Sequence, residues 1–291
     1  MEVEKERYVF DGRLPWLEGR RKYIGSSDAA AIMGHGYAGE SISTVWGSKV
    51  GTYEKKFSQA DLDLMEDGRI AEEFVVRMFA TKHKNIAVTK SQPFEIEVCK
   101  EYPFIAATLD ASGLKDGKRF PIEAKLIVNQ PEEWKDDECP VKYQIQLQHQ
   151  MLVTGAEFGV VVAFVCGRYN ERWFERDDAF LGKAVQVYET FWKHVIDRTP
   201  PPDNSPQAYE IRRAVTEWGT AKRLGISSSQ KVRDYFAMLM ELKKVEKSVN
   251  SAKAAIAEIV GPVEFIILDD QRVVKMTRSG LVLQKQLPRG V

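Results

Sequence analysis

Apolar residues in the first 200 positions follow two periods, one typical of helices and one typical of strands. Between Gln59 and Ala80 they recur three and four residues apart, which predicts an amphipathic helix that could be interrupted at Asp67-Gly68. The glutamine-rich stretch from Val141 to Val153 is predicted as a second helix, ended by Gly155, and a third covers Asp178 to Arg198.

Strands are predicted between these helices. The run from Phe158 to Cys166 is nearly all apolar and holds four valines, which is typical of a strand buried on both faces in the middle of a sheet. The composition of Ser112 to Gly117 predicts a turn that joins the flanking runs, 104–109 and 120–128, as a hairpin. The remaining strands are predicted within 86–98 and at 168–176. This order of elements predicts an α/β core with a mixed sheet.

The segment from Thr199 to Pro206 is the clearest boundary, because repeated proline excludes both helix and sheet. We therefore expect one domain over residues 1–200 and an appendage over 207–291. The appendage is predicted to hold a long helix from about Gln230 to Val260 and a small hairpin over 263–276. Apolar residues spaced by threes and fours between positions 235 and 259 suit either a coiled-coil seam or a helix folded back on the core.

Composition narrows the class of protein. Of 291 residues 44% are hydrophobic, enough for a full core, yet no apolar run approaches the roughly 20 residues that cross a bilayer. The first residues lack a signal peptide, so we expect a soluble protein in the cytoplasm of a bacterial or phage-infected cell. The three cysteines and four histidines are scattered, which argues against a disulfide framework and a zinc site.

The segment 130–139 is acidic and predicted as a surface loop, with a short helix around Trp134.

Charge is balanced overall and uneven along the chain. Forty-two basic residues equal forty-two acidic ones, which argues against a protein that coats nucleic acid by bulk charge. From Ser205 onward fifteen Lys and Arg stand against nine Asp and Glu. A basic tail suits phosphates or an acidic partner, and it is equally compatible with an ordinary solvated surface.

Asp110, Glu123 and Lys125 are the strongest candidate chemistry. Glu123 and Lys125 lie two apart in a predicted strand, so their side chains leave the same face. Asp110 ends the preceding apolar run, and a hairpin would bring its carboxylate to the other two groups. Carboxylates bind Mg²⁺ together with phosphate oxygens, and a nearby ammonium can orient a water or offset developing charge. The three residues therefore point to phosphodiester hydrolysis.

A second candidate lies near the start of the chain. Arg20 and Arg21 precede Gly25-Ser26-Ser27-Asp28, which is predicted to cap an alanine-rich helix that Gly34 ends. Free N–H groups, a serine hydroxyl and arginines together suit a phosphate. The same residues are also explained by an N-capped helix with its arginines in solvent.

Four ordered blocks connect these candidates. They are Trp16-x3-Arg20 with Ile24 to Gly34, Gly68-x3-Glu72, Leu109-Asp110-Ala111 with Ile122 to Lys125, and Tyr143-x2-Gln146-x-Gln148-x2-Met151 to Gly155. In this order they resemble the YqaJ or lambda-type phage recombination exonucleases of the PD-(D/E)XK nuclease superfamily. The resemblance implies a PD-(D/E)XK core, with a central mixed sheet flanked by helices and a C-terminal helix-plus-hairpin appendage.

The resemblance also implies roles for residues at the predicted metal site. Asp110 and Glu123 would bind Mg²⁺, for which Mn²⁺ would substitute, and Glu72 would be a further acidic group at the metal. Lys125 would position the attacking water. Leu109 stands where the family usually has proline, a change that alters only the shape of the turn.

Further roles follow from the other blocks. Gln146 and Gln148 match the family's glutamine helix, in which one glutamine supports the active site, and both remain candidates. Arg20 and Ser27 match a pocket for a DNA 5′-phosphate.

The implied function is a Mg²⁺-dependent 5′-to-3′ exonuclease on double-stranded DNA ends in phage-type homologous recombination. The resemblance further implies a homo-oligomer in the form of a trimeric ring and a single-strand annealing protein as partner, with the basic tail or the 235–259 stripe as its docking surface. Two alternatives stay open at this point. One is an endonuclease of the same superfamily, and the other is a non-catalytic module that binds DNA ends.

Overall fold

The computed structural model describes residues 6–54, 58–128, 134, 138–205, 208, 230–260, 265–267, 273–277 and 280–284. The chain divides into two compact units, Met1–Glu217 and Trp218–Val291, and each is described by itself. Within the described residues, no helix is both long enough and apolar enough to cross a membrane.

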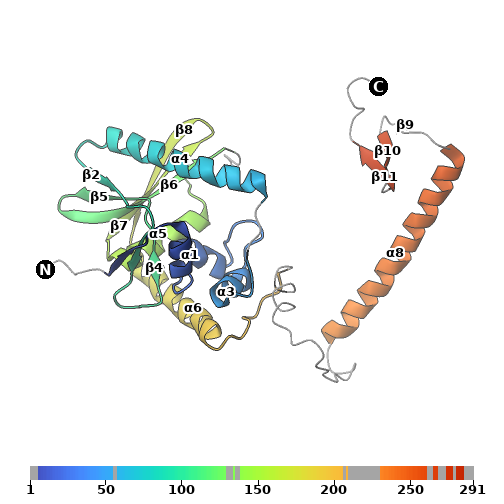
Figure 1. Ribbon diagram of the computed structural model, residues 1–291, viewed down its shortest axis with the longest axis horizontal. Helices are drawn as coiled ribbons and strands as arrows, with labels where there is room; N and C mark the ends of the chain where they lie inside the picture. Colours follow the sequence, from blue (N-terminus) through green and yellow to red (C-terminus); the bar gives the residue numbers. More distant parts are fainter. Residues whose placement is uncertain are drawn as a thin grey trace. The chain divides into compact units, whose positions relative to one another are not determined.

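A five-stranded mixed sheet forms the centre of the first unit, as the strand pattern predicts (Figure 1). The order is β2-β5-β6-β7-β8, in which β6 and β7 run parallel and the other neighbours antiparallel. Four consecutive residues of β7, Val160 to Ala163, are fully buried, so this strand is covered on both faces as predicted. The strands are β2 (Ala87–Lys90), β5 (Ala111–Lys115), β6 (Lys118–Ile127), β7 (Phe158–Val165) and β8 (Arg168–Glu175).

The hairpin that follows Asp110 differs from the predicted one. Most of the predicted turn, 112–117, belongs to β5, and the chain reverses at Asp116 and Gly117, whose φ angles are 52° and 75°. Gly113 is typical of turns, which is why a turn was predicted here, but in the structure it leaves room for a neighbouring ring inside the strand. It stands opposite Phe120, and a Cβ on this glycine would lie 2.2 Å from the Phe120 ring.

Residues 104–109, predicted as the first strand of the hairpin, instead contribute to a second, smaller sheet. Within 104–109 a strand, β4 (Ala106–Ala107), is short and pairs with β3 (Glu95–Val98), which in turn pairs with β1 (Arg7–Val9). The prediction of a longer strand here was wrong because the backbone bonds of this run go elsewhere. Ile24 donates to Phe104 O at 2.8 Å and accepts from Ala106 N at 3.0 Å.

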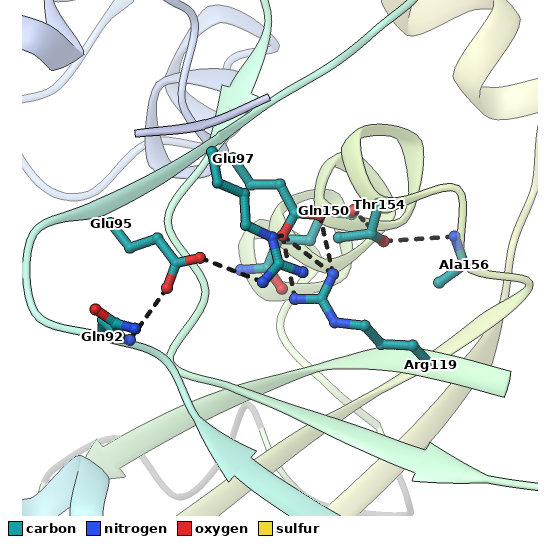
Figure 2. Close-up of polar contacts among 8 residues, drawn as sticks. Gln92, Glu95, Glu97, Arg119, Gln150, Thr154 and Ala156 are labelled. Atoms are coloured by element: carbon teal, nitrogen blue, oxygen red, sulfur yellow. Dashed lines mark hydrogen bonds and ion pairs between the residues drawn. The ribbon is translucent and has the colours of Figure 1, made fainter. Parts of the chain in front are cut away.

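A buried ion pair joins the two sheets. Arg119 of β6 donates to both carboxylate oxygens of Glu97 on β3, at 2.9 and 3.1 Å, and Glu97 is 3% exposed (Figure 2). Arg7 of β1 lies 3.8 Å from the same carboxylate. This paired charge fixes the small sheet against the end of β6.

Helices cover both faces of the central sheet (Figure 1). Val75, Val76 and Phe79 bury one side of α4 against it. The possible interruption at Asp67-Gly68 does not occur, since α4 runs unbroken through it and Glu66 pairs with Arg69 at 2.6 Å across the glycine. Among its described residues, the helices of this unit are α1 (Arg13–Arg20), α2 (Ser26–Ile32), α3 (Ile42–Val50), α4 (Gln59–Lys82), α5 (Val141–Thr154) and α6 (Asp178–Ile196).

The central helix α5 is buried along most of its length although it is rich in glutamine. It follows Pro140 and ends at Gly155, whose φ of 67° is the left-handed cap predicted there. Thr154 donates to Gln150 O at 2.8 Å and accepts from Ala156 N at 3.4 Å, which closes the end of the helix (Figure 2). Polar side chains on such a helix must find partners inside the protein.

The proline-rich boundary segment belongs to the first unit. Pro201 is buried, and Asp203 accepts a hydrogen bond from Ser43 N at 3.2 Å. The predicted acidic loop at 130–139 lies mostly outside the described residues. Trp134, which is described, is 6% exposed.

The second unit contains α8 (Gln230–Val260) and three antiparallel strands in the order β11-β10-β9. Its strands are β9 (Phe265–Ile267), β10 (Val273–Thr277) and β11 (Gly280–Gln284). The third strand was not predicted, and residues 268–272 in the middle of the predicted hairpin lie outside the described residues. Every residue of α8 from 241 to 250 is exposed within the described part of the chain. The two interpretations of its apolar stripe both remain predictions.

Candidate functional site

The candidate site is built on the β5–β6 hairpin. The register pairs Ala111 with Ile122, which places Asp110 and Glu123 next to each other across the two strands. Asp110 Oδ2 accepts a hydrogen bond from Ala124 N at 2.8 Å, so the backbone of β6 fixes this carboxylate. Glu123 is 4% exposed. The hairpin therefore brings the two predicted carboxylates together inside the protein.

Both oxygens of Glu123 have partners. Lys125 Nζ forms an ion pair with Oε1, and Gln150 Nε2 of α5 donates to Oε2 at 2.5 Å. The Lys125 side chain is 18% exposed. The alternation of β6 thus places acid and base on one face, as the sequence predicts for residues two apart.

Burial and like charge dominate the electrostatics here. Burial, and then the neighbouring charge of Glu123, raise the pKa of Asp110 well above its usual value. Burial lowers the pKa of Lys125, but Glu123 and Asp110 outweigh it, and the pKa stands well above its usual value. Burial also raises the pKa of Glu72 on α4, against the opposing charge of Lys125. Three carboxylates and one lysine therefore form one electrostatic group with a surplus of acid.

These residues suit a divalent cation that is held by few protein ligands. Within the described residues, no group of three or more His, Cys, Asp or Glu side chains stands ready to enclose a metal. Mg²⁺, however, is commonly bound by one or two carboxylates together with phosphate oxygens of a substrate. Asp110 and Glu123 supply that number, and the raised pKa of Asp110 shows that added positive charge would stabilise the ionised site.

The glutamines of α5 have different surroundings. Gln148 donates to Glu175 O at 2.7 Å and accepts from Asp177 N at 2.9 Å, so it holds the connection between β8 and α6. Gln146 is buried, with 3% exposure. Gln150, which sequence reasoning missed, is the glutamine that contacts Glu123. Its spacing of four from Gln146, one helical turn on the same face, was a signal that could have found it.

The second predicted site lies where α1 meets α2. Arg20 Nη2 donates to Ser27 Oγ at 3.3 Å, and the Arg20 guanidinium lies 4.8 Å from the Trp16 ring centroid. The structure thus brings the two predicted phosphate-binding residues into contact. Asp28 accepts from Gly25 N at 2.8 Å, which caps α2 as the sequence predicts.

Lys49 of α3 joins this group of side chains, and its own sequence context does not reveal this because it comes from a separate helix. Its Nζ lies 2.6 Å from Asp28 Oδ2, and the Lys49 side chain is 6% exposed. Burial opposes ionisation of Asp28, but Lys49 and Arg20 outweigh it and lower the pKa of Asp28. Burial likewise lowers the pKa of Lys49, against the attraction of Asp28. One acid and two bases leave a surplus of positive charge.

Helix α5 connects the two sites through adjacent residues. Gln150 donates to Glu123, whereas His149 Nε2 donates to Ala106 O at 3.0 Å and is subject to the charges of Asp28 and Lys49. Burial lowers the pKa of His149 to about 4, so this imidazole is neutral at pH 7. The acidic and basic sites therefore flank one buried helix.

Comparison with known proteins gives a consistent picture. Residues 15–157 match the family model of the YqaJ-like viral recombinase domain. The uncharacterized protein YqaJ of Bacillus subtilis (strain 168) is 26% identical over 263 residues, with 86% of this chain and 79% of that protein covered.

Two crystal structures of LHK-Exo are similar in fold. The complex with dAMP has a TM-score of 0.51 and the alkaline exonuclease LHK-Exo from Laribacter hongkongensis one of 0.50. Each is 16% identical, with 69% of this chain and 97% of that chain covered. These likenesses confirm the predicted fold class, a central mixed sheet flanked by helices.

Proposed function

Because residues 15–157 match the family model of the YqaJ-like viral recombinase domain, we propose that the protein is a metal-dependent deoxyribonuclease that degrades DNA from an end. The observation that carries the proposal is the buried group of Asp110, Glu123 and Lys125 on one hairpin, with its surplus of acid. The alkaline exonuclease LHK-Exo, whose fold is similar, is in one structure bound to dAMP, and this supports the same chemistry.

Asp110 and Glu123 would hold Mg²⁺, or Mn²⁺ in its place, with Glu72 as a further acidic group. A bound divalent ion lowers the pKa of a water and stabilises charge that develops on a phosphoryl group. Lys125 lies against Glu123, so its ammonium can orient the attacking water and offset negative charge. Gln150 holds the other oxygen of Glu123 and so fixes the direction in which this carboxylate points.

The pocket of Arg20, Ser27 and Lys49 supports action from an end. Its surplus of positive charge and its contact between guanidinium and hydroxyl suit a terminal phosphate. We further propose that the enzyme degrades DNA in the 5′-to-3′ direction, that its substrate is double-stranded DNA, and that it acts in phage-type recombination. A ring-shaped homo-oligomer and a single-strand annealing partner belong to the same proposal.

The test uses one linear duplex labelled at its 5′ or its 3′ end, and the same DNA as a closed circle. With Mg²⁺ we expect the linear duplex to be degraded from its 5′ ends and the closed circle to remain intact, and EDTA to stop the reaction. Cutting of the closed circle would show an endonuclease instead. Binding of ends without any hydrolysis, in Mg²⁺ or in Mn²⁺, would show a non-catalytic module and refute the proposal.

A further inference from the structure

A short ladder of aromatic rings leads from the interior to the surface beside the hydrolytic centre. The ring centroids of Trp134 and Tyr143 lie 5.9 Å apart, and those of Tyr143 and Tyr37 lie 6.4 Å apart. Trp134 and Tyr143 are buried, with 6% and 4% exposure, whereas Tyr37 is 37% exposed. The ladder therefore ends in a ring that solvent can reach.

Two lysines lie along this ladder. Lys125 Nζ is 5.5 Å from the centroid of the Tyr143 ring, so the middle ring of the ladder lies beside the residue proposed to orient water. Lys142 Nζ is 5.2 Å from Tyr143 and 5.3 Å from Tyr37. The exposed ring is thus bordered by a positive charge on the first turn of α5.

The loop between α2 and α3 holds Tyr37 in place. Gly34 and Gly39, with φ angles of 83° and 78°, allow the chain to turn sharply on both sides of the tyrosine. Tyr37 N donates to the carboxylate of Glu40 at 3.2 Å, and Glu40 N donates to Tyr37 O at 2.9 Å. The ring is therefore presented by a closed turn, on the same loop that follows the helix of the phosphate pocket.

We infer that Tyr37 and Lys142 bind an unpaired nucleotide next to the hydrolytic centre, with the base stacked on Tyr37 and a phosphate beside Lys142. Core packing explains Trp134 and Tyr143, but it does not explain an exposed ring bordered by a cation. Base stacking on an aromatic side chain is tolerant of sequence, and lysine contacts with phosphates add affinity. The inference rests on the proposed function and names its substrate more closely, as a DNA end whose strands have separated.

The first measurement is the binding of a single-stranded oligonucleotide, with 2-aminopurine at successive positions, to the full chain in EDTA. Tyr37→Leu should weaken binding about tenfold and remove quenching at one position of the strand, because stacking is lost. Tyr37→Phe keeps the ring and should bind as the wild type does. Tyr8→Leu changes an exposed tyrosine on β1 and serves as the matched control, with no expected effect.

The second measurement is the salt dependence of the same binding. Lys142→Gln should reduce the slope of log affinity against log salt by about 0.7, the value for one phosphate contact on a single strand. Lys118→Gln, an exposed lysine at the far end of β6, should leave the slope unchanged.

Binding in EDTA separates this inference from the proposed function. If Tyr37-dependent binding persists while Mg²⁺ never produces hydrolysis, the proposed function fails and the stacking site stands. If the protein hydrolyses DNA while Tyr37→Leu and Lys142→Gln, with unchanged melting temperatures, bind like the wild type, the inference is overturned.

Discussion

Two buried carboxylate–lysine pairs in this protein have opposite surroundings. Glu123 and Lys125 are joined by Asp110 and Glu72, so acid outnumbers base. The other pair, Asp28 and Lys49, is joined by Arg20, so base outnumbers acid there. Two pairs of the same chemical kind thus lie at sites of opposite net charge.

The difference appears in the pKa of each group. Burial and like charge raise the pKa of Asp110, whereas Lys49 and Arg20 overcome burial to lower that of Asp28. The two lysines diverge in the same sense, since the pKa of Lys125 is raised by Glu123 and Asp110, whereas burial lowers that of Lys49. The net charge of the first site would therefore suit a cation and that of the second an anion, and the additional neighbours of each pair account for this difference.

The largest effect is expected from Lys125→Met, which removes the base from the acidic site. Without this ammonium we expect DNA hydrolysis to fall about 10³-fold, as for removal of a group that stabilises developing charge. Single-turnover hydrolysis in Mg²⁺ would measure it. Lys118→Met on the same strand is the matched control, because Lys118 is exposed and pairs with Glu157 at the other end of β6. Unchanged hydrolysis in Lys125→Met would contradict the role given to this lysine.

A smaller effect, on stability, is expected from Asp28→Asn in the basic site. The change leaves Lys49 buried without its carboxylate, and we expect a loss of about 3 kcal/mol in the free energy of unfolding at pH 7. Because the folded pKa of Asp28 is lowered, its contribution is complete above about pH 4 and is lost as the pH falls through the folded value.

Denaturant unfolding of wild type and variant between pH 3 and pH 7 would measure this difference. Asp178→Asn is a suitable control, since Asp178 is 78% exposed and pairs with Arg176 at the surface. A difference that does not shrink on acidification would show that the carboxylate charge is not what stabilises this pocket.

The smallest effect is expected from Arg20→Gln, which leaves the buried pair intact. We expect the preference for a 5′-phosphate over a 5′-hydroxyl to fall about tenfold, because a charged hydrogen bond to the phosphate is lost. Initial rates on the two forms of one linear duplex would measure it. Arg21→Gln alters the neighbouring arginine and should keep the preference. Equal rates on both forms with the wild type would refute a phosphate pocket.

Short-range patterns predicted much of this molecule. The period of α5, its end at Gly155 and the buried strand β7 follow from spacing and composition alone. The face shared by Glu123 and Lys125 follows from strand alternation.

Contacts between distant segments could not be predicted in this way. Lys49 reaches Asp28 from another helix, and nothing in its own surroundings distinguishes it. Gly113 belongs to a segment whose composition is typical of a turn, but it lies within strand β5 against the ring of Phe120. The backbone bonds of Ile24 divert the run before Asp110 into a separate sheet. In each case tertiary contacts outweigh the local preference.

The position of α5 beside both sites has a consequence for how the sites can move. Gln150 of this helix donates to Glu123, and other residues of α5 pack against α2, which carries Ser27 and Asp28. Because α5 is a rigid, buried helix, we expect the two sites to move together rather than independently. If the protein degrades DNA from an end as proposed, the distance from the bound end to the bond that is cut would be set by the protein rather than by the DNA sequence.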